Sequence, residues 1–430
     1  MAHQSKEERM SDLMKRMLAT VLVCALLLSC VSLAIAEDKK TLIVWIPQYQ
    51  FSKAEDAISD QDFWDGVFDP FEEENNCEVK VEIVGWGVYG DTFFTSLVNE
   101  DGPDVVYVTD NYDLVKRDLL LGLDPYLTQE QKDNVLLWNT APENANGEKV
   151  IVPMDDGVAI GYVNTKLLKE AGLDELPLEW DAFIEACKTI QEKTGKRAFL
   201  QNWGATSGTS ALMLAFWPYY FQAGGKMLNE AGEIDIDNEA GLKTVEFLKK
   251  LKDEGIFTDD IVTESESVDK FAAGEVAFIV CDLNKGNSSF TPAGVEWEYV
   301  FSLKGPVGYG ARTATDSFAV NKKTVARGND ELAVKALMYI TSGAVMDEFH
   351  SKIFYLPPFT KDAAFVKDEA LNALTSAHTE DIYVVEEFAA KKSFEDTLLA
   401  NIQEMFQGNL EPQEVLTETM DYYNTQLKEE

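Results

Sequence analysis

The sequence predicts an α/β protein organised in two units. Between residues 41 and 109, three short apolar runs alternate with two segments whose apolar residues recur at helical spacing. Parallel strands need long crossover connections, so this order favours a parallel sheet with helices on its faces. A second series of helices and strands begins near residue 160, and a chain of 430 residues is long enough for two domains.

Residues 1–36 are predicted to be a signal peptide. A basic segment, Met14-Lys15-Arg16, precedes an apolar core, and Ala34-Ile35-Ala36 forms a small-x-small cleavage site. Leu27-Leu28-Ser29-Cys30 resembles a bacterial lipobox instead, which would make Cys30 a lipidated terminus. The residues after Cys30 stay apolar, whereas a lipoprotein tether is usually polar, so cleavage after Ala36 is favoured. Both interpretations predict export to the extracellular or periplasmic space, the second with a lipid anchor on the outer face of the cytoplasmic membrane.

The first unit is predicted to carry ligand-binding groups where its strands end. Its strands and helices are expected at 41–46, 61–74, 79–86, 89–99 and 104–109. Ligands of such sheets bind beyond the carboxyl ends of the strands. Those ends carry Gln48, Trp86, Asp110 and Asn111, which combine aromatic surface with amide and carboxylate groups. Each of them alone is more often an ordinary loop residue, but their convergence on one sheet edge predicts a ligand site.

Residues 152–164 are predicted to form the first crossing between the two units. Pro153 favours an extended conformation for the residue before it, and the apolar run from Val158 to Val163 is typical of a buried strand. Asp155 and Asp156 lie at the expected crossing and are candidate ligand contacts. An ordinary strand with a polar lead-in explains this segment about as well locally. The α/β organisation on both sides favours the crossing.

The second unit is predicted to contain helices at 165–171, 178–193, 238–254 and 268–273 and a strand at 276–280. The Gly- and hydroxyl-rich segment 202–210 is not a phosphate-binding loop, because no Gly-Lys-Ser/Thr closes it. Trp203 in this segment and Asp282 after the strand are candidate ligand contacts. Core packing is the alternative for Trp203. The aromatic run 216–221 is expected to be mostly core.

Composition and motifs exclude several function classes. The chain carries 37 Lys and Arg against 75 Asp and Glu, for a formal net charge of −38. This charge argues against nucleic acid and against docking on an anionic membrane. The leader aside, the cysteines Cys77, Cys187 and Cys281 are odd in number and far apart, so they predict no disulfide framework. His350 and His378 sit in no recognisable motif, so we expect no cofactor, no metal and no histidine-based catalysis.

Several short blocks of this sequence follow one another in an order that a known family shares. They are Gly102-Pro103-Asp104-Val105-Val106, Leu121-Gly122-Leu123-Asp124-Pro125-Tyr126-Leu127, the block from Tyr162 to Leu173, Trp180-Asp181-Ala182-Phe183, and Phe271-Ala272-Ala273-Gly274-Glu275-Val276-Ala277. These blocks resemble the extracellular solute-binding proteins of ABC importers, the maltose-binding-protein-like family. Each block is weak alone, but their order is specific, and the resemblance runs from about residue 41 to the C-terminus.

The resemblance implies a two-lobed fold of the type II periplasmic-binding-protein kind, with hinge-linked lobes that close on a ligand in the cleft between them. It implies that residues 37–155 and 317–380 form lobe one and that residues 156–316 and 381–430 form lobe two. Asp316 would lie at the second crossing, and Tyr355, in a block similar to the family's G-x-L-P turn, would be a further ligand contact. The implied partners are the membrane subunits of an ABC permease. We expect a monomer without enzymatic activity.

The class of ligand stays open at this point. A sugar presents apolar C–H faces and many hydroxyl groups, which suit an aromatic ring with Asp, Asn or Gln around it. A cationic solute such as a polyamine also suits carboxylates with aromatic rings. An exported carbohydrate-active hydrolase would need paired carboxylates, but adjacent residues such as Asp155 and Asp156 point to opposite faces of a strand. The sugar is favoured, because amide and hydroxyl groups accompany the acids and the blocks most resemble the carbohydrate branch of the family.

Overall fold

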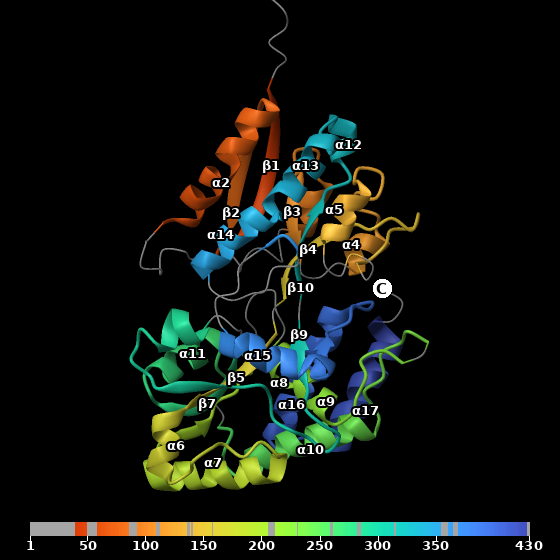
Figure 1. Cartoon of the computed structure of the whole chain (residues 1–430). Coiled ribbons are helices and arrows are strands. Elements are labelled where there is room, and N and C mark those ends of the chain that lie inside the picture. The colour runs from red at the N-terminus through yellow and green to blue at the C-terminus, as the bar shows by residue number, and fades with distance from the viewer. Residues whose placement is uncertain are drawn as a thin grey trace, which may run out of the picture.

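The structure, a computed structural model, contains two bodies, and the chain passes between them more than once (Figure 1). It describes residues 39–49, 58–85, 93–108, 112–135, 138, 141–156, 158–204, 211–229, 231–258, 261–281, 285–313, 315–353, 360–363 and 369–427. The first body holds the N-terminal strands, drawn in red and orange. The second body holds the yellow and green middle of the chain together with the blue C-terminal helices.

The first body is built on a five-stranded sheet with the order β2-β1-β3-β10-β4. Its strands are β1 (Lys40–Pro47), β2 (Cys77–Val84), β3 (Val105–Val108), β4 (Ile151–Asp156) and β10 (Thr315–Val320). The parallel pairing predicted for the first three strands is confirmed, because β1 pairs in parallel with both β2 and β3. β10 is antiparallel to both β3 and β4. The sheet is therefore mixed. The chain returns from the second body into β10, so β10 begins at the side of the sheet where β3 ends.

The first body also contains helices, the longer of which bury apolar residues. They are α2 (Asp60–Asn75), α4 (Tyr112–Lys116), α5 (Gln129–Asn134), α12 (Thr324–Arg327), α13 (Asp330–Ile340) and α14 (Gly343–Ile353). The helix predicted over 61–74 is confirmed as α2, whose Phe63, Trp64 and Phe68 are buried. Ser59 caps it, because its side chain accepts a hydrogen bond from the backbone N–H of Asp62.

The second body is built on a four-stranded sheet with the order β6-β7-β5-β8 and a two-stranded pair of β9 and β11. The strands are β5 (Ile160–Asn164), β6 (Arg197–Phe199), β7 (Val276–Cys281), β8 (Trp297–Val300), β9 (Ala311–Thr313) and β11 (Ile382–Val384). The helices before residue 300 are α6 (Thr165–Ala171), α7 (Trp180–Thr194), α8 (Leu212–Ala215), α9 (Trp217–Gln222), α10 (Glu239–Asp253), α11 (Glu264–Ala272) and the π-helix η3 (Gly286–Phe290). The later ones are α15 (Glu369–Ala377), the 3₁₀ turn η4 (Thr379–Asp381), α16 (Lys391–Phe406), α17 (Pro412–Tyr422) and the π-helix η5 (Tyr423–Leu427).

Aromatic side chains form much of the core of the second body. Trp180 stacks on Phe247 with ring centroids 4.1 Å apart, so α7 packs on α10. The indole N–H of Trp217 donates to Glu395 Oε1 at 2.6 Å, which ties α9 to the C-terminal helix α16. The aromatic run 216–221, predicted to be mostly core, is buried throughout. None of the helices within the described ranges has the length and apolar character of a membrane span.

The start of α6 shows how the sequence sets a helix boundary at the end of a strand. Asn164 ends β5, and its Oδ1 accepts a hydrogen bond from the N–H of Leu167 at 3.1 Å. Gly172 ends the helix at a φ of 80°, in the left-handed conformation that glycine adopts without strain. The helix predicted over 165–171 is confirmed at both ends.

We expect Asn164→Ala to lower the free energy of unfolding by about 1 kcal/mol, because the N-terminus of α6 loses its capping acceptor. Asn164→Asp keeps an acceptor at the same place and is the matched control, so it should stay close to the wild type. Chemical denaturation of the three proteins measures both effects. Equal losses in the two variants would show that the cap is not what Asn164 contributes.

Candidate functional site

Two chain segments cross side by side between the two bodies. β4 ends at Asp156 in the first sheet and β5 begins at Ile160 in the second, while β9 ends at Thr313 and β10 begins at Thr315. Thr315 lies opposite Asp156 in the ladder of β10 and β4. The backbone N–H of Ala159 donates to the carbonyl oxygen of Arg312 at 3.1 Å. The two crossings are therefore bonded to each other on both sides of the junction (Figure 1).

The strand registers bring several strand ends to one edge of the first sheet. β1 and β3 are parallel and paired in register, so both end at the same edge. Ser317, near the start of the antiparallel β10, lies opposite Val108 at the end of β3. Asp316 lies opposite Asp155, near the end of β4. The carboxyl ends of β1, β3 and β4 therefore meet the start of β10 at the edge where the chain crosses to the second body.

Three carboxylate-bearing residues occupy this edge. Asp155 and Asp316 are direct cross-strand neighbours, which places their Cα atoms roughly 5 Å apart. Asp156 is the next residue along β4, and the side chain of Asp316 is half-buried. Like charges opposite one another destabilise a sheet, so this pairing is costly unless a ligand or neighbouring groups donate hydrogen bonds to the carboxylates. We name Asp155, Asp156 and Asp316 the crossing carboxylates.

Gln48 extends the same edge from β1. Its side chain is exposed, and its backbone N–H donates to the carbonyl oxygen of Val84 at 3.0 Å. The next residue, Tyr49, donates its N–H to Asp60 at the start of α2, and its ring packs edge-on against Tyr107 and Phe349. The backbone at the end of β1 is thereby fixed, and it presents the Gln48 amide at the sheet edge.

Trp203 lies in the hydrophobic core of the second body. Only 4% of the residue is exposed, and its ring packs edge-on against Phe257 and Phe406, with centroids 5.6 and 5.0 Å away. Its backbone N–H donates to the carbonyl oxygen of Val262 at 3.1 Å. Of the two interpretations of this tryptophan, the geometry favours core packing, because the faces and edges of its ring are covered by side chains of the second body.

The other predicted site residues are outside the part of the chain that the structure describes. They are Trp86, Asp110, Asn111, Asp282 and Tyr355, together with the possible lipidation site Cys30. Their roles stay predictions. Conversely, the structure adds Thr315, which the sequence did not single out. Its position opposite Asp156 depends on pairing between strands about 160 residues apart, and no local pattern in the sequence signals it.

The two histidines in the described part of the chain lie in different bodies. His350 is fully buried in the first body, and burial lowers its pKa to about 3. His378 lies in the second body, where its ring stacks on Phe301 and its Nδ1 lies 2.9 Å from Asp381 Oδ2. Among the described residues, no three His, Cys, Asp or Glu side chains are grouped as metal ligands, and Cys77, Cys187 and Cys281 are free, buried thiols.

A family model described as bacterial extracellular solute-binding protein matches residues 55–346. The curated arabinooligosaccharide-binding protein of Halalkalibacterium halodurans is 28% identical over 107 residues, which are 25% of this chain and 22% of that protein. The match therefore spans about a fifth of that relative's length.

Solved structures resemble almost the whole chain. The GacH receptor of Streptomyces glaucescens, described unliganded and with acarbose, superposes with a TM-score of 0.74 at 20% identity and covers 91% of this chain and 99% of its own. The maltotriose-bound MalE domain of Bdellovibrio bacteriovorus superposes with a TM-score of 0.72 at 18% identity, over 90% of this chain and 99% of its own. These likenesses confirm the predicted type II periplasmic-binding-protein-like fold.

Proposed function

Because the chain belongs to the bacterial extracellular solute-binding protein family, we propose that it binds a sugar or oligosaccharide between its two bodies and delivers it to the membrane subunits of an ABC importer. The observation that carries the proposal is the gathering of Gln48 and the crossing carboxylates at one sheet edge beside both crossings. The relatives support the choice of ligand, since the curated one is named for an arabinooligosaccharide and the structures above were described with acarbose and maltotriose.

The chemistry of this edge suits a neutral polyol. Carboxylate oxygens accept hydrogen bonds from sugar hydroxyls, whereas the Gln48 amide both donates and accepts. A ligand between the bodies would contact groups on both crossings, so its binding would couple to their relative orientation. We propose that Trp86 and Tyr355 supply the aromatic surface for the sugar's C–H faces.

The two sheets support the proposed lobes. Strands β1 to β4 and β10 lie in the first sheet, and β5 to β8 lie in the second. Leu371 of α15 is buried in one core cluster with Ile160 and Ala311 of the second body. We therefore propose that the third crossing lies before α15, earlier than the boundary at residue 380, and that Asp156, Thr315 and Asp316 belong to the first lobe with the strands that carry them. We also propose a monomer that is exported by the leader of residues 1–36, with lipidation at Cys30 as the alternative to cleavage after Ala36.

A cationic solute is the second candidate. Three carboxylate-bearing residues share the crossing, and the chain's net charge of −38 favours cations over anions in general. A polyamine would neutralise the repulsion between Asp155 and Asp316 directly. The family is one of binding proteins, so we do not propose the hydrolase.

The test is a thermal-unfolding panel of oligosaccharides, polyamines and short peptides with the purified protein. A ligand that binds only the folded state stabilises it by about 2.7 kcal/mol at a hundredfold excess over its dissociation constant. We expect an oligosaccharide to raise the melting temperature and the polyamines to leave it unchanged. A melting temperature that no sugar moves, while a polyamine or peptide raises it, would replace the proposed ligand class.

Asp156→Asn should weaken sugar binding by about tenfold, because the amide still accepts a hydrogen bond but loses the charge that strengthens it. Glu170→Gln is the matched control, since Glu170 is exposed on α6 and is not part of the crossings. Calorimetric titration of both variants measures the effect. If Asp156→Asn binds the sugar as the control does, the residue does not contact the ligand.

A further inference from the structure

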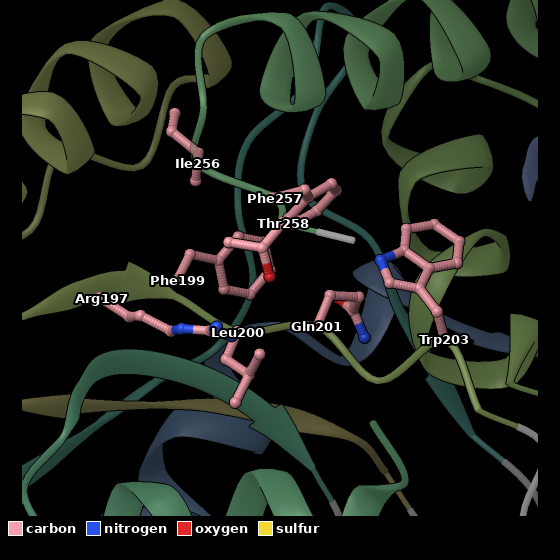
Figure 2. A pocket seen from close by; sticks show the side chains of 8 residues that line it. All are labelled: Arg197, Phe199, Leu200, Gln201, Trp203, Ile256, Phe257 and Thr258. Carbon is pink, nitrogen blue, oxygen red and sulfur yellow. The ribbon is translucent and has the colours of Figure 1, made fainter. Parts of the chain in front are cut away.

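A small pocket lies in the second body between β6 and the end of α10 (Figure 2). Arg197, Phe199, Leu200, Gln201 and Trp203 line it from β6 and the segment that follows, and Ile256, Phe257 and Thr258 line it from the segment after α10. Figure 2 shows the indole nitrogen of Trp203 turned towards the space between these two segments. The pocket therefore lies between two segments of the chain that are distant in the sequence.

The indole N–H of Trp203 is a buried donor that reaches no acceptor among the residues the structure describes. The polar side chains beside it are paired: the hydroxyl of Tyr219 donates to Gln201 Oε1 at 2.9 Å, and Gln201 Nε2 donates to Asn202 Oδ1 at 3.0 Å. Trp180 shows the usual arrangement for a buried indole, since its N–H donates to Gln222 Oε1 at 2.8 Å. A buried donor without an acceptor is costly, so the Trp203 N–H requires one.

The size and polarity of the pocket indicate which molecule it can bind. Its empty volume is about 210 Å³ even when space open to solvent is included, less than the roughly 300 Å³ at the lower end of ligand pockets. The pocket has room for about one water molecule, and a water site also needs two to four polar partners. Besides the indole, the guanidinium of Arg197, the amide of Gln201 and the hydroxyl of Thr258 belong to residues of its wall.

We propose that this pocket binds one ordered water molecule, which accepts the hydrogen bond of the Trp203 indole N–H and donates to oxygen atoms of the wall. The amide oxygen of Gln201 keeps a second lone pair after it accepts from Tyr219, and this residue lies in the wall of the pocket. The water links the segment 201–203 to the segment 256–258. It fixes residues 201–204 on the core, and this role is independent of the proposed ligand.

Nuclear magnetic resonance on a deuterated, ¹⁵N-labelled sample of the protein tests this proposal without altering the site. The indole N–H signal of Trp203 is assigned as the one that disappears in Trp203→Phe, a variant that keeps an aromatic ring in the core. We expect this signal to show a cross-peak to a long-lived water. The indole signals of Trp180 and Trp217, whose N–H groups donate to protein oxygens, are the internal controls and should show none.

A crystal structure of the same protein at a resolution that shows ordered water provides the second readout. We expect density for one water within hydrogen-bonding distance of Trp203 Nε1. Absence of the water cross-peak, or an indole that donates directly to a protein atom in the crystal, would overturn the proposal. If Trp203→Phe does not fold, the Trp203 signal is assigned by elimination, with single Trp→Phe variants of the other seven of the chain's 8 tryptophans.

Discussion

Trp203→Ala should lower the free energy of unfolding by about 3 to 5 kcal/mol, the usual cost of removing a large aromatic side chain from a core. The ring is 4% exposed and lies between Phe257 and Phe406, so its loss opens a cavity between β6, α10 and the C-terminal helix α16. Guanidinium unfolding of the variant and the wild type measures the loss. The affinity of the folded variant for its ligand should change much less than its stability.

Trp203→Phe is the control for the size of the side chain. It retains a ring between Phe257 and Phe406 and should lose clearly less stability than the alanine variant. The opposite result would be a stable Trp203→Ala protein with strongly weakened ligand binding. It would show that Trp203 contacts the ligand, which is the other interpretation of this residue in the sequence.

Arg327→Met should lower the free energy of unfolding by about 3 kcal/mol, because it leaves a buried carboxylate without its cation. Arg327 Nη2 lies 2.7 Å from Asp104 Oδ1, and the side chain of Asp104 is only 3% exposed. The same guanidinium donates to the carbonyl oxygens of Glu100 and Gly102, so it also fixes the turn before β3. Methionine keeps most of the side chain's length and apolar contact, so the variant loses the charge and the guanidinium's hydrogen bonds but little packing.

The loss should shrink as the pH falls. Burial raises the pKa of Asp104, although the N–H of Ile43 and the guanidinium of Arg327 oppose that shift. Without Arg327 the folded-state pKa rises further, so the variant takes up the proton at a higher pH than the wild type does. Below both values Asp104 is neutral in either protein, and the variant's charge penalty is gone. Urea unfolding at pH 7 and at successively lower pH measures this trend.

Lys322→Met is the matched control for Arg327→Met. Lys322 pairs with Asp118, also in the first body, but these side chains are 46% and 54% exposed. Exposed pairs contribute at most about 1 kcal/mol, so this variant should remain near the wild type. Equal losses in the two variants would show that burial of Asp104 does not decide the effect.

Local patterns were sufficient to predict several elements of the fold, among them β1, β2, β3, β7, α2, α6, α7 and α10. The helical spacing in 178–193 anticipated α7, whose Phe183, Ile184, Cys187 and Ile190 are buried. The pairing of β10 was not predictable in the same way, because its partners β3 and β4 lie far away in the sequence and its antiparallel direction depends on where the chain returns from the second body. Core packing of Trp203 could not be predicted either, because glycine-containing segments occur in exposed loops and also in buried parts of a protein.

The candidate site was predictable to the extent that it depends on strand ends. Gln48, Asp155 and Asp156 could be placed there because an apolar run gives way to polar residues at each of these positions. The register of β10 and β4 places Asp155 opposite Asp316 and Asp156 opposite Thr315. A local turn fixes the register only of strands that are close in the sequence, so these pairs could not be predicted. The register of strands that are distant in the sequence is determined by the packing of the whole sheet.

The most direct measurement of the central claim is a calorimetric titration of the purified protein with the oligosaccharide that most raises its melting temperature, at 0.01 M and 1 M salt. The screening length falls between these conditions from about 30 Å to about 3 Å, so a charged ligand is affected and a neutral one is not. We predict one binding site per chain and a dissociation constant that is nearly the same at both salt concentrations. Binding by a polyamine alone, lost at high salt and in Asp156→Asn, would contradict the account.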